Sequence, residues 1–347
     1  MRGKRWTRFL FLILIFTMVF TGCAKKTTPI ETPGVIEPNV QTPGEAPAIA
    51  GSISPLTGLV VENVEALKLR PIAVMIDNEV SARPQSGLMN ADIIYEIPVE
   101  GNITRYMAIY LDKISEKIGP VRSARPYFLD KSMEFGAVYV HCGGSPQALK
   151  DIVDLKIDAL NDLKGSPCFW RAKDRKMPHN LYASTELMRE VTLKNKLETS
   201  TASAYFQFSD DFLDLDGKKV DNISIKYYSG YFVGYEYNES EKLYYRSVNG
   251  KQLKDKEKEN PIKAVNIIIE RLNAKVLDSA GRLAITNIGK DRGYLLTGGK
   301  LIEIEWQKDS RGAKTVYKDL QGNEIKLNKG NTWINVVPYT SKIEIGE

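Results

Sequence analysis

The chain has 347 residues, of which 43% are hydrophobic and 26% are charged, a composition that excludes a wholly disordered or collagen-like protein. Its formal net charge is +5, but residues 1–22 hold four basic and no acidic side chains, which leaves 44 basic against 43 acidic residues in the rest of the chain. This nearly neutral remainder gives no reason to expect a nucleic-acid partner, and the length suggests two domains, each able to bury its own core.

The first 22 residues have the pattern of a bacterial lipoprotein signal peptide. A basic start is followed by an apolar run over residues 9–20, too short to span a bilayer comfortably, and then by Thr21, Gly22 and Cys23. We therefore predict cleavage before Cys23, attachment of a diacylglycerol to its thiol and addition of an N-acyl group, with palmitate as a fatty chain. This would anchor the protein to the cell membrane on its extracytoplasmic side. The alternative is an uncleaved signal anchor.

Residues 23–52 are predicted to be a disordered tether that begins at the lipidated cysteine. Five prolines occur in this segment, and it has almost no apolar periodicity. Such a composition cannot bury enough surface to fold, so the segment is expected to hold the folded part away from the membrane.

Residues 53–205 are predicted to be a mixed α/β layered domain. Short runs rich in β-branched residues predict strands over residues 72–76, 93–97, 106–111 and 137–140. Apolar residues at helical spacing predict helices over residues 127–135 and 146–155, and a third helix after Ser184. Ser145 is a suitable N-cap for the second helix, because Pro146 follows it at the first helical position.

Residues 206–347 are predicted to be a β-rich, mostly antiparallel domain, which makes the whole an α+β protein. Strand patterns separated by turn signals such as Asn249-Gly250 and Gly298-Gly299 support this interpretation. The expected strands cover residues 223–228, 231–237, 243–248, 264–269, 282–286, 294–297, 301–306, 314–317 and 332–337. The charged run 251–260 is expected to be a solvated connection.

The candidate binding residues concentrate in the first domain, where basic side chains lie in loops beside glycine and proline. Arginine presents a planar fork of donors that matches phosphate or carboxylate oxygens, and a glycine turn before a helix is an anion site. We predict an anion pocket from these residues: Arg83, Arg105, Arg122, Arg125, His141, Gly143, Gly144, Ser145, Arg171, His179 and Asn180. The alternative is that each arginine pairs with a nearby carboxylate for structural reasons.

Two further sets of residues leave alternatives open. Asp77 ends the first predicted strand, where it is a candidate metal ligand or a loop cap. Cys142 and Cys168 could form a disulfide outside the cytoplasm, but the sequence does not determine their separation. A zinc site or a cysteine–histidine nucleophile is less specific, because the spacing of known motifs is missing.

The motifs of the chain strongly resemble the YerB-like family of bacterial lipoproteins. They occupy residues 70–78, 82–88, 91–96, 103–106, 118–126, 141–146 and 179–182, with Thr332-Trp333-Ile334 and Val337-Pro338 near the C-terminus. The resemblance covers nearly all of the chain from about residue 54. It implies a tethered lipoprotein of two domains without an established molecular function. Cys142 stands where a small residue such as alanine is expected in relatives, which argues against a thiol mechanism.

The first domain also resembles, more weakly, the LytR-CpsA-Psr envelope domain in the order of its elements. The match rests on Asp77-Asn78, Thr104-Arg105, residues 121–126 and Gly143-Gly144. That resemblance implies aspartates that hold magnesium and arginines that hold a polyprenyl pyrophosphate. Arg105 stands where the second metal-binding aspartate would be, which supports anion binding and weakens the case for phosphotransfer.

We therefore predict a non-catalytic envelope lipoprotein without a cofactor. It would bind an anionic envelope ligand (phosphate, polyprenyl phosphate or acidic glycan) or a wall-synthesis protein. One alternative is a magnesium-dependent phosphotransferase or pyrophosphatase that acts on polyprenyl-linked glycan through Asp77. Another is a protein or peptidoglycan docking module in the β domain, with aromatic residues lining a sugar groove. These aromatic residues are Tyr231, Tyr235, Tyr244, Trp306 and Trp333.

Overall fold

The structure is a computed structural model that describes residues 52–61, 63–198 and 205–346. Residues Ala48–Glu347 form a compact unit by themselves, separate from Met1–Pro47. The predicted signal peptide, Cys23 and nearly all of the tether lie outside the described residues. Within the described ranges, no helix combines the length and the apolar character needed to cross a membrane.

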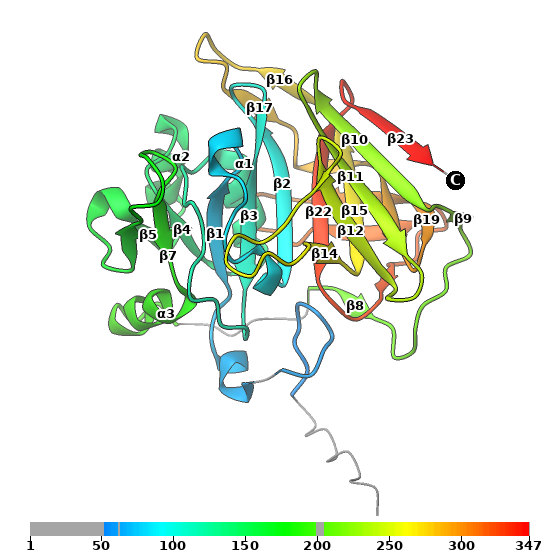
Figure 1. Cartoon of the computed structure of the whole chain (residues 1–347), viewed down its shortest axis with the longest axis horizontal. Coiled ribbons are helices and arrows are strands. Elements are labelled where there is room, and N and C mark those ends of the chain that lie inside the picture. Colours follow the sequence, from blue (N-terminus) through cyan, green and yellow to red (C-terminus); the bar gives the residue numbers. More distant parts are fainter. Residues whose placement is uncertain (1–51, 62, 199–204, 347) are drawn as a thin grey trace, which may run out of the picture. The chain divides into compact units, whose positions relative to one another are not determined.

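A large mixed sheet organises residues from both halves of the chain (Figure 1). Its order is β20-β19-β18-β15-β22-β2-β3-β1-β4-β5, and the short strand β9 (Lys218–Lys219) pairs with β19. The strands are β1 (Ile72–Asp77), β2 (Ile93–Val99), β3 (Ile103–Tyr110), β4 (Val138–His141), β5 (Ala159–Asn161), β15 (Asn266–Leu272), β18 (Gly289–Thr297), β19 (Lys300–Lys308), β20 (Val316–Asp319) and β22 (Thr332–Pro338).

The two halves of the chain meet where β2 runs parallel to β22, with Ile93 opposite Thr332. The predicted division between residues 53–205 and 206–347 remains a prediction, but strands from both ranges share one continuous hydrogen-bonded sheet. The predicted α+β class is confirmed, because three α-helices accompany many strands within the described residues.

Both faces of the large sheet are covered, so its central strands β1, β2, β3 and β22 are buried along almost their whole length and are mainly apolar. In β1, Ile72, Val74 and Ile76 face one core, and Ala73 and Met75 face the other. The first core also contains inward side chains of a second sheet and of α3 (Thr185–Lys194). The second core contains residues of α1 (Pro126–Met133) and α2 (Pro146–Asp154).

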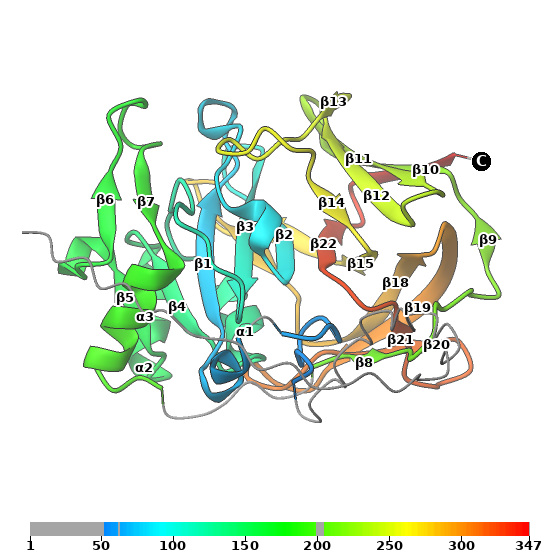
Figure 2. The same ribbon diagram turned by 60° about the horizontal axis from the view of Figure 1, so that its bottom comes forward.

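The second sheet has the order β13-β12-β11-β10-β23, with β14 pairing with β12 (Figures 1 and 2). Its strands are β10 (Asn222–Tyr228), β11 (Tyr231–Asn238), β12 (Leu243–Val248), β13 (Lys251–Gln252), β14 (Lys263–Ala264) and β23 (Lys342–Gly346). The predicted turn at Asn249 and Gly250 joins β12 to β13, and both residues have the positive φ that such a hairpin requires.

Three short strand pairs complete the part of the fold that the structure describes. They are β6 (Phe169–Arg171) with β7 (Leu181–Ala183), β8 (Gln207–Phe208) with β21 (Lys326–Leu327), and β16 (Ala274–Val276) with β17 (Leu283–Ile285). The prediction that residues 251–260 are a solvated connection is wrong in part. Asp255 is buried and accepts a hydrogen bond from the backbone nitrogen of Gly87 at 2.7 Å, so this loop packs against the first half.

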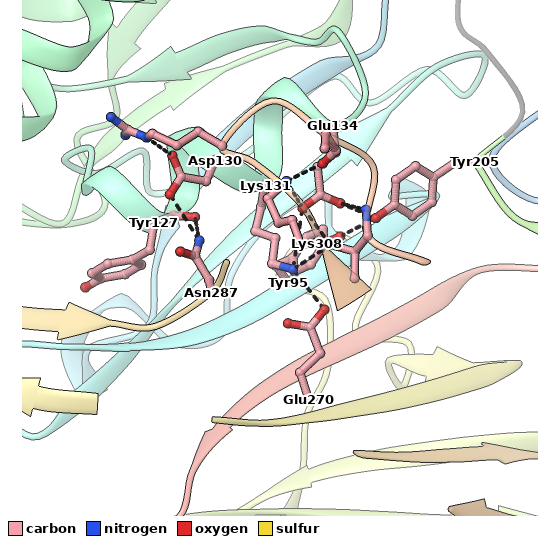
Figure 3. A network of polar contacts seen from close by, with 12 residues as sticks. Tyr95, Tyr127, Asp130, Lys131, Glu134, Tyr205, Glu270, Asn287 and Lys308 are labelled. Carbon is pink, nitrogen blue, oxygen red and sulfur yellow. Dashed lines mark hydrogen bonds and ion pairs between the residues drawn. The ribbon is translucent and has the colours of Figure 1, made fainter. Parts of the chain in front are cut away.

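A buried ionic network joins α1 to the C-terminal strands (Figure 3). Nζ of Lys131 lies 2.9 Å from a carboxylate oxygen of Glu270 on β15, and Nζ of Lys308 on β19 lies 2.8 Å from Glu134. All four side chains are excluded from solvent. Burial raises the pKa of Glu134, but the two lysines together hold this pKa below its usual value. The network therefore ties the first half of the chain to the second through paired charges.

Candidate functional site

Three neighbouring parallel strands end in polar residues at the same end of the large sheet, which we call the sheet edge. β1 ends at Asp77, β4 at His141 and β5 at Asn161, and β1, β4 and β5 run in the same direction. In sheets with parallel strands, the carboxyl ends are where ligands bind, because the loops that follow them gather at the same edge. Of the predicted binding residues, the loops that follow β1 and β4 contain Arg83, Gly143, Gly144 and Ser145.

Asp77 is the centre of the first group at this edge. Its side chain is fully buried, and its Oδ2 accepts a hydrogen bond from Nδ1 of His179 at 2.7 Å. Nε of Arg122 lies 2.9 Å from the same oxygen, and Oδ1 accepts a bond from the backbone nitrogen of Glu79. The bond to Asp77 places a proton on Nδ1 of His179. Its Nε2 lies 3.7 Å from Glu79.

Arg105 adds a second buried cation beside Asp77. The two residues are direct partners in the antiparallel pairing of β1 with β3. The guanidinium of Arg105 donates to the carbonyl of Ser123 at 2.9 Å, but its Nε has no partner within the described residues. Burial lowers the pKa of Arg105; Asp77 opposes this shift and Arg122 adds to it. Two arginines therefore share the field of one buried carboxylate.

Arg83 joins this group through Asn78. Its Nε and Nη2 donate to the side-chain and backbone oxygens of Asn78, at 3.0 and 2.7 Å. Its guanidinium also lies 4.9 Å from the ring centre of Tyr231. The structure thus brings together Arg83, Arg105, Arg122, His179 and Asp77, five of the residues predicted from the sequence. We call these five residues the Asp77 cluster.

The Asp77 cluster is held from behind by a buried network that sequence reasoning missed. Asn78 donates to Thr104, Thr104 donates to Glu96 at 2.6 Å, and Glu96 pairs with Arg246 from β12. Arg246 is fully buried, 4.1 Å from the ring centre of Trp333. One signal was available in the sequence, since Arg246 occupies an inward position in the alternating pattern of β12.

Arg125 and Arg171 do not join the Asp77 cluster. Arg125 is paired with both carboxylate oxygens of Glu100. Arg171 donates to Asp162 and Asn180, each at 3.1 Å. For these two arginines the structural alternative describes the geometry, because each has its own acceptor. Their predicted role in ligand binding remains a prediction.

His141, Gly143, Gly144 and Ser145 form a second group at the start of α2. Ser145 caps this helix as predicted, because its Oγ accepts a bond from the backbone nitrogen of Ala148 at 3.2 Å. Nδ1 of His141 lies 2.6 Å from the carbonyl of Gly143, and the backbone nitrogen of Gly143 donates to Asn161. The predicted single pocket is thus divided between two groups on the same sheet edge.

Asp77 does not fit a divalent cation. Its Oδ2 already interacts with Arg122 and His179, and the neighbouring Arg105 makes the surroundings positive. In the ranges that the structure covers, no group of three histidine, cysteine, aspartate or glutamate side chains is arranged to hold a metal ion. The magnesium proposed for the alternative function therefore has no suitable set of ligands around Asp77.

Cys142 and Cys168 are both free thiols in the structure. Burial raises the pKa of both, to about 12 for Cys168, and Asp162 raises that of Cys142 further. Neither thiol is activated as a nucleophile, because the reactive form is the thiolate.

The five aromatic residues that were considered for a sugar groove in the β domain are core residues. Each has a relative exposure of 4% or less. They are Tyr231, Tyr235, Tyr244, Trp306 and Trp333. A docking function of the second half would therefore need other side chains.

Comparisons with known proteins agree on one family. Residues 56–200 match the family described as "Protein of unknown function (DUF3048) N-terminal domain", and residues 223–334 match the corresponding C-terminal domain. The chain is 37% identical over 292 residues to the Bacillus subtilis (strain 168) protein named "Putative lipoprotein YerB", covering 82% of this chain and 86% of that protein. It is also similar to the crystal structure of the YerB protein from Bacillus subtilis. That likeness has a TM-score of 0.76 at 33% identity, over 84% of this chain and 99% of that chain.

Proposed function

The chain belongs to the DUF3048, or YerB-like, family of unknown function, and on this premise we propose that it is a lipoprotein of the bacterial cell envelope that binds an anionic ligand. The lipobox ending at Cys23 and the name of the Bacillus subtilis relative, "Putative lipoprotein YerB", support the anchor. An exported lipoprotein faces the extracytoplasmic side of the membrane. Its ligand is then a molecule of the envelope.

The observation that carries the proposal is the excess of positive charge around Asp77. Arg105 is buried and forms no ion pair of its own with a described carboxylate, while Arg122 and His179 already use the carboxylate of Asp77. A buried cation without a counterion is unfavourable, and a bound anion supplies that counterion. Arg83 and Arg122 are only partly buried, so their guanidinium groups can reach a ligand from solvent.

The chemistry of these donors favours an anion with several oxygens. Guanidinium groups form bidentate hydrogen bonds with phosphate and carboxylate oxygens, and a pyrophosphate and an acidic sugar both present such oxygens. Phosphate, polyprenyl phosphate and acidic glycan are therefore the ligand classes that we propose. A wall-synthesis protein with an acidic surface segment presents the same oxygens, and small anions would compete with it.

Calorimetric titration tests this proposal on the compact unit Ala48–Glu347. Inorganic phosphate, pyrophosphate and glucuronate are added at low salt, with and without magnesium. We expect at least one of them to bind, and magnesium to make no difference. Arg122→Ala should weaken binding by about tenfold or more, since a hydrogen bond to a charged group contributes about 1.5–3 kcal/mol. The affinity of Arg122→Lys should lie between those of Arg122→Ala and the unchanged protein, because lysine keeps the positive charge but lacks the planar fork of donors.

The controls separate lost binding from lost folding. Arg292→Ala removes an exposed arginine outside the Asp77 cluster and should leave binding unchanged. Arg122→Ala also deprives the buried Asp77 of its ion pair, so thermal melting is measured for every variant. Arg122→Lys keeps a cation beside Asp77, so it should melt close to the unchanged protein while it still binds the anion more weakly. If no anion binds, or if Arg122→Ala binds as well as the unchanged protein, the proposal is wrong.

A further inference from the structure

A cavity of about 590 Å³ lies between α2 and the edge strand β5 of the large sheet. This volume is in the range of ligand pockets, about 300–1,000 Å³. Leu149, Ile152 and Val153 form an apolar stripe on α2 at positions i, i+3 and i+4, and they line one side of the cavity. Ile157 and Leu163, around β5, are also part of its lining. We call this cavity the α2 groove.

The apolar walls of the α2 groove are open to solvent. The relative exposure is 65% for Val153, 70% for Leu163 and 36% for Leu149. Soluble proteins rarely expose several large apolar side chains side by side unless the patch is used for binding. Packing within the fold accounts for Ile152, which lies against the second core with Ala148, but it does not account for the exposure of Leu149, Val153 and Leu163.

A polar atom inside the α2 groove has no partner. His141 is 99% buried and lines the cavity, and its Nδ1 is engaged with the carbonyl of Gly143. Its Nε2 forms no hydrogen bond with a described residue, and this atom is not fully enclosed by the protein. Burial lowers the pKa of His141, and its Nδ1 faces a carbonyl oxygen, so Nε2 of the neutral ring carries a lone pair that is free to accept a hydrogen bond.

Two lysines give the rim of the α2 groove a positive charge. Lys156 and Lys164 both line the cavity, and neither forms an ion pair with a described carboxylate. The acidic neighbours are already used: Asp154 pairs with Lys150, Asp158 with Arg70 and Asp162 with Arg171. The rim thus complements a negative group.

We propose that the α2 groove binds a single molecule of an anionic amphiphile. The aliphatic chain of the ligand would lie between α2 and β5, and its charged group would lie at Lys156 and Lys164. A fatty acid and an anionic phospholipid share this chemistry. His141 would accept a hydrogen bond from a hydroxyl or amide of the ligand near the base of the groove. The site is distinct from the Asp77 cluster, and the two ligands differ, so this proposal stands or falls independently of the proposed function.

The test is calorimetric titration of the unit Ala48–Glu347 with decanoate below its micelle concentration. Decyltrimethylammonium and decyl glucoside serve as cationic and neutral probes with the same chain, and dihexanoyl phosphatidylglycerol tests the phospholipid source. We expect saturable binding of decanoate, of the phosphatidylglycerol or of both, at least tenfold tighter than that of the cationic and neutral probes. Double replacement of Lys156 and Lys164 by glutamate should remove this preference.

Matched variants locate the site. Val153→Asp introduces a negative charge into the groove and should weaken decanoate binding at least tenfold. Val276→Asp, at a valine with 66% exposure on β16, should leave binding unchanged. Leu163→Ser changes another exposed wall residue without adding a charge and guards against a helix defect from Val153→Asp. Pyrophosphate binding should be unaffected by all three.

Three results would overturn the proposal. The first is absence of saturable binding by decanoate and by the phosphatidylglycerol. The second is equal affinity for the cationic probe. The third is binding to anionic vesicles that Val153→Asp abolishes while no monomer binds, because the groove would then be a membrane contact.

Discussion

Replacing Asp92 by asparagine should remove a large part of the pH dependence of the protein's stability. Asp92 is fully buried just before β2. Its Oδ2 accepts a bond from the backbone nitrogen of Leu111 at 2.8 Å, but its Oδ1 has no hydrogen-bond partner and lies 3.8 Å from Nζ of Lys113. Burial raises the pKa of this carboxyl from 3.8 to about 7, and the nearby lysine only partly opposes the shift.

The sign of the effect follows from proton binding in the two states. Between pH 4 and pH 7 the folded protein keeps the proton on Asp92 and the unfolded chain has lost it. The stability from this proton is fully present below pH 3.8 and is lost as the pH rises through about 7. At 1.36 kcal/mol per pH unit, the whole loss is about 4 kcal/mol, of which about 2.5 kcal/mol falls between pH 5 and pH 8.

Urea unfolding of Ala48–Glu347, followed by tryptophan fluorescence at pH 5 and pH 8, measures this effect. The difference in unfolding free energy between Asp92→Asn and the unchanged protein should shift in favour of the variant by about 2.5 kcal/mol from pH 5 to pH 8. The control Asp216→Asn, at an exposed aspartate, should show no such shift. Parallel pH profiles of Asp92→Asn and the unchanged protein would refute the argument that a buried carboxyl titrates near neutrality.

Two further predictions concern the buried network and the thiols. Lys131→Met should lower the unfolding free energy by about 3–5 kcal/mol in urea titrations, because it removes a buried positive charge that compensates Glu270 and Glu134. Lys150→Met, in an exposed ion pair, should change the unfolding free energy little. Equal effects of the two substitutions would contradict this account. Cys168 should react with a thiol reagent at pH 8 only after unfolding, because burial raises its pKa to about 12, and immediate reaction of the folded protein at Cys168 would count against its enclosure.

The Asp77 cluster and the α2 groove occupy the same edge of the large sheet. The Asp77 cluster lies at the end of β1, and the α2 groove lies beside β4 and β5. A hydrogen bond from the backbone nitrogen of Cys142 to the carbonyl of Arg122 connects the two regions. If both proposals hold, one protein would bind an anion and an amphiphile at neighbouring strand ends. Loss of one ligand with retention of the other, in the variants above, would show that the two sites work separately.

Much of the local structure could be predicted from the sequence. The runs over residues 72–76 and 243–248 are strands, and the helix that follows Ser145 begins at Pro146. These features depend on residues within a few positions of one another, through side-chain alternation, capping and turn chemistry. The position of the arginines in loops of the first half could also be predicted, because the neighbouring strand and helix patterns show where the loops lie.

The tertiary structure decided which of those arginines meet. Arg105 lies beside Asp77 because β1 and β3 pair in one particular register, whereas Arg125 turns to Glu100. The parallel pairing of β2 with β22 joins segments more than two hundred residues apart, and the burial of Arg246 against Trp333 depends on how two sheets stack. Local periodicity determines which elements form and which face is apolar. Register and stacking depend on the free energy of burying those faces against distant partners, which no short segment of the sequence contains.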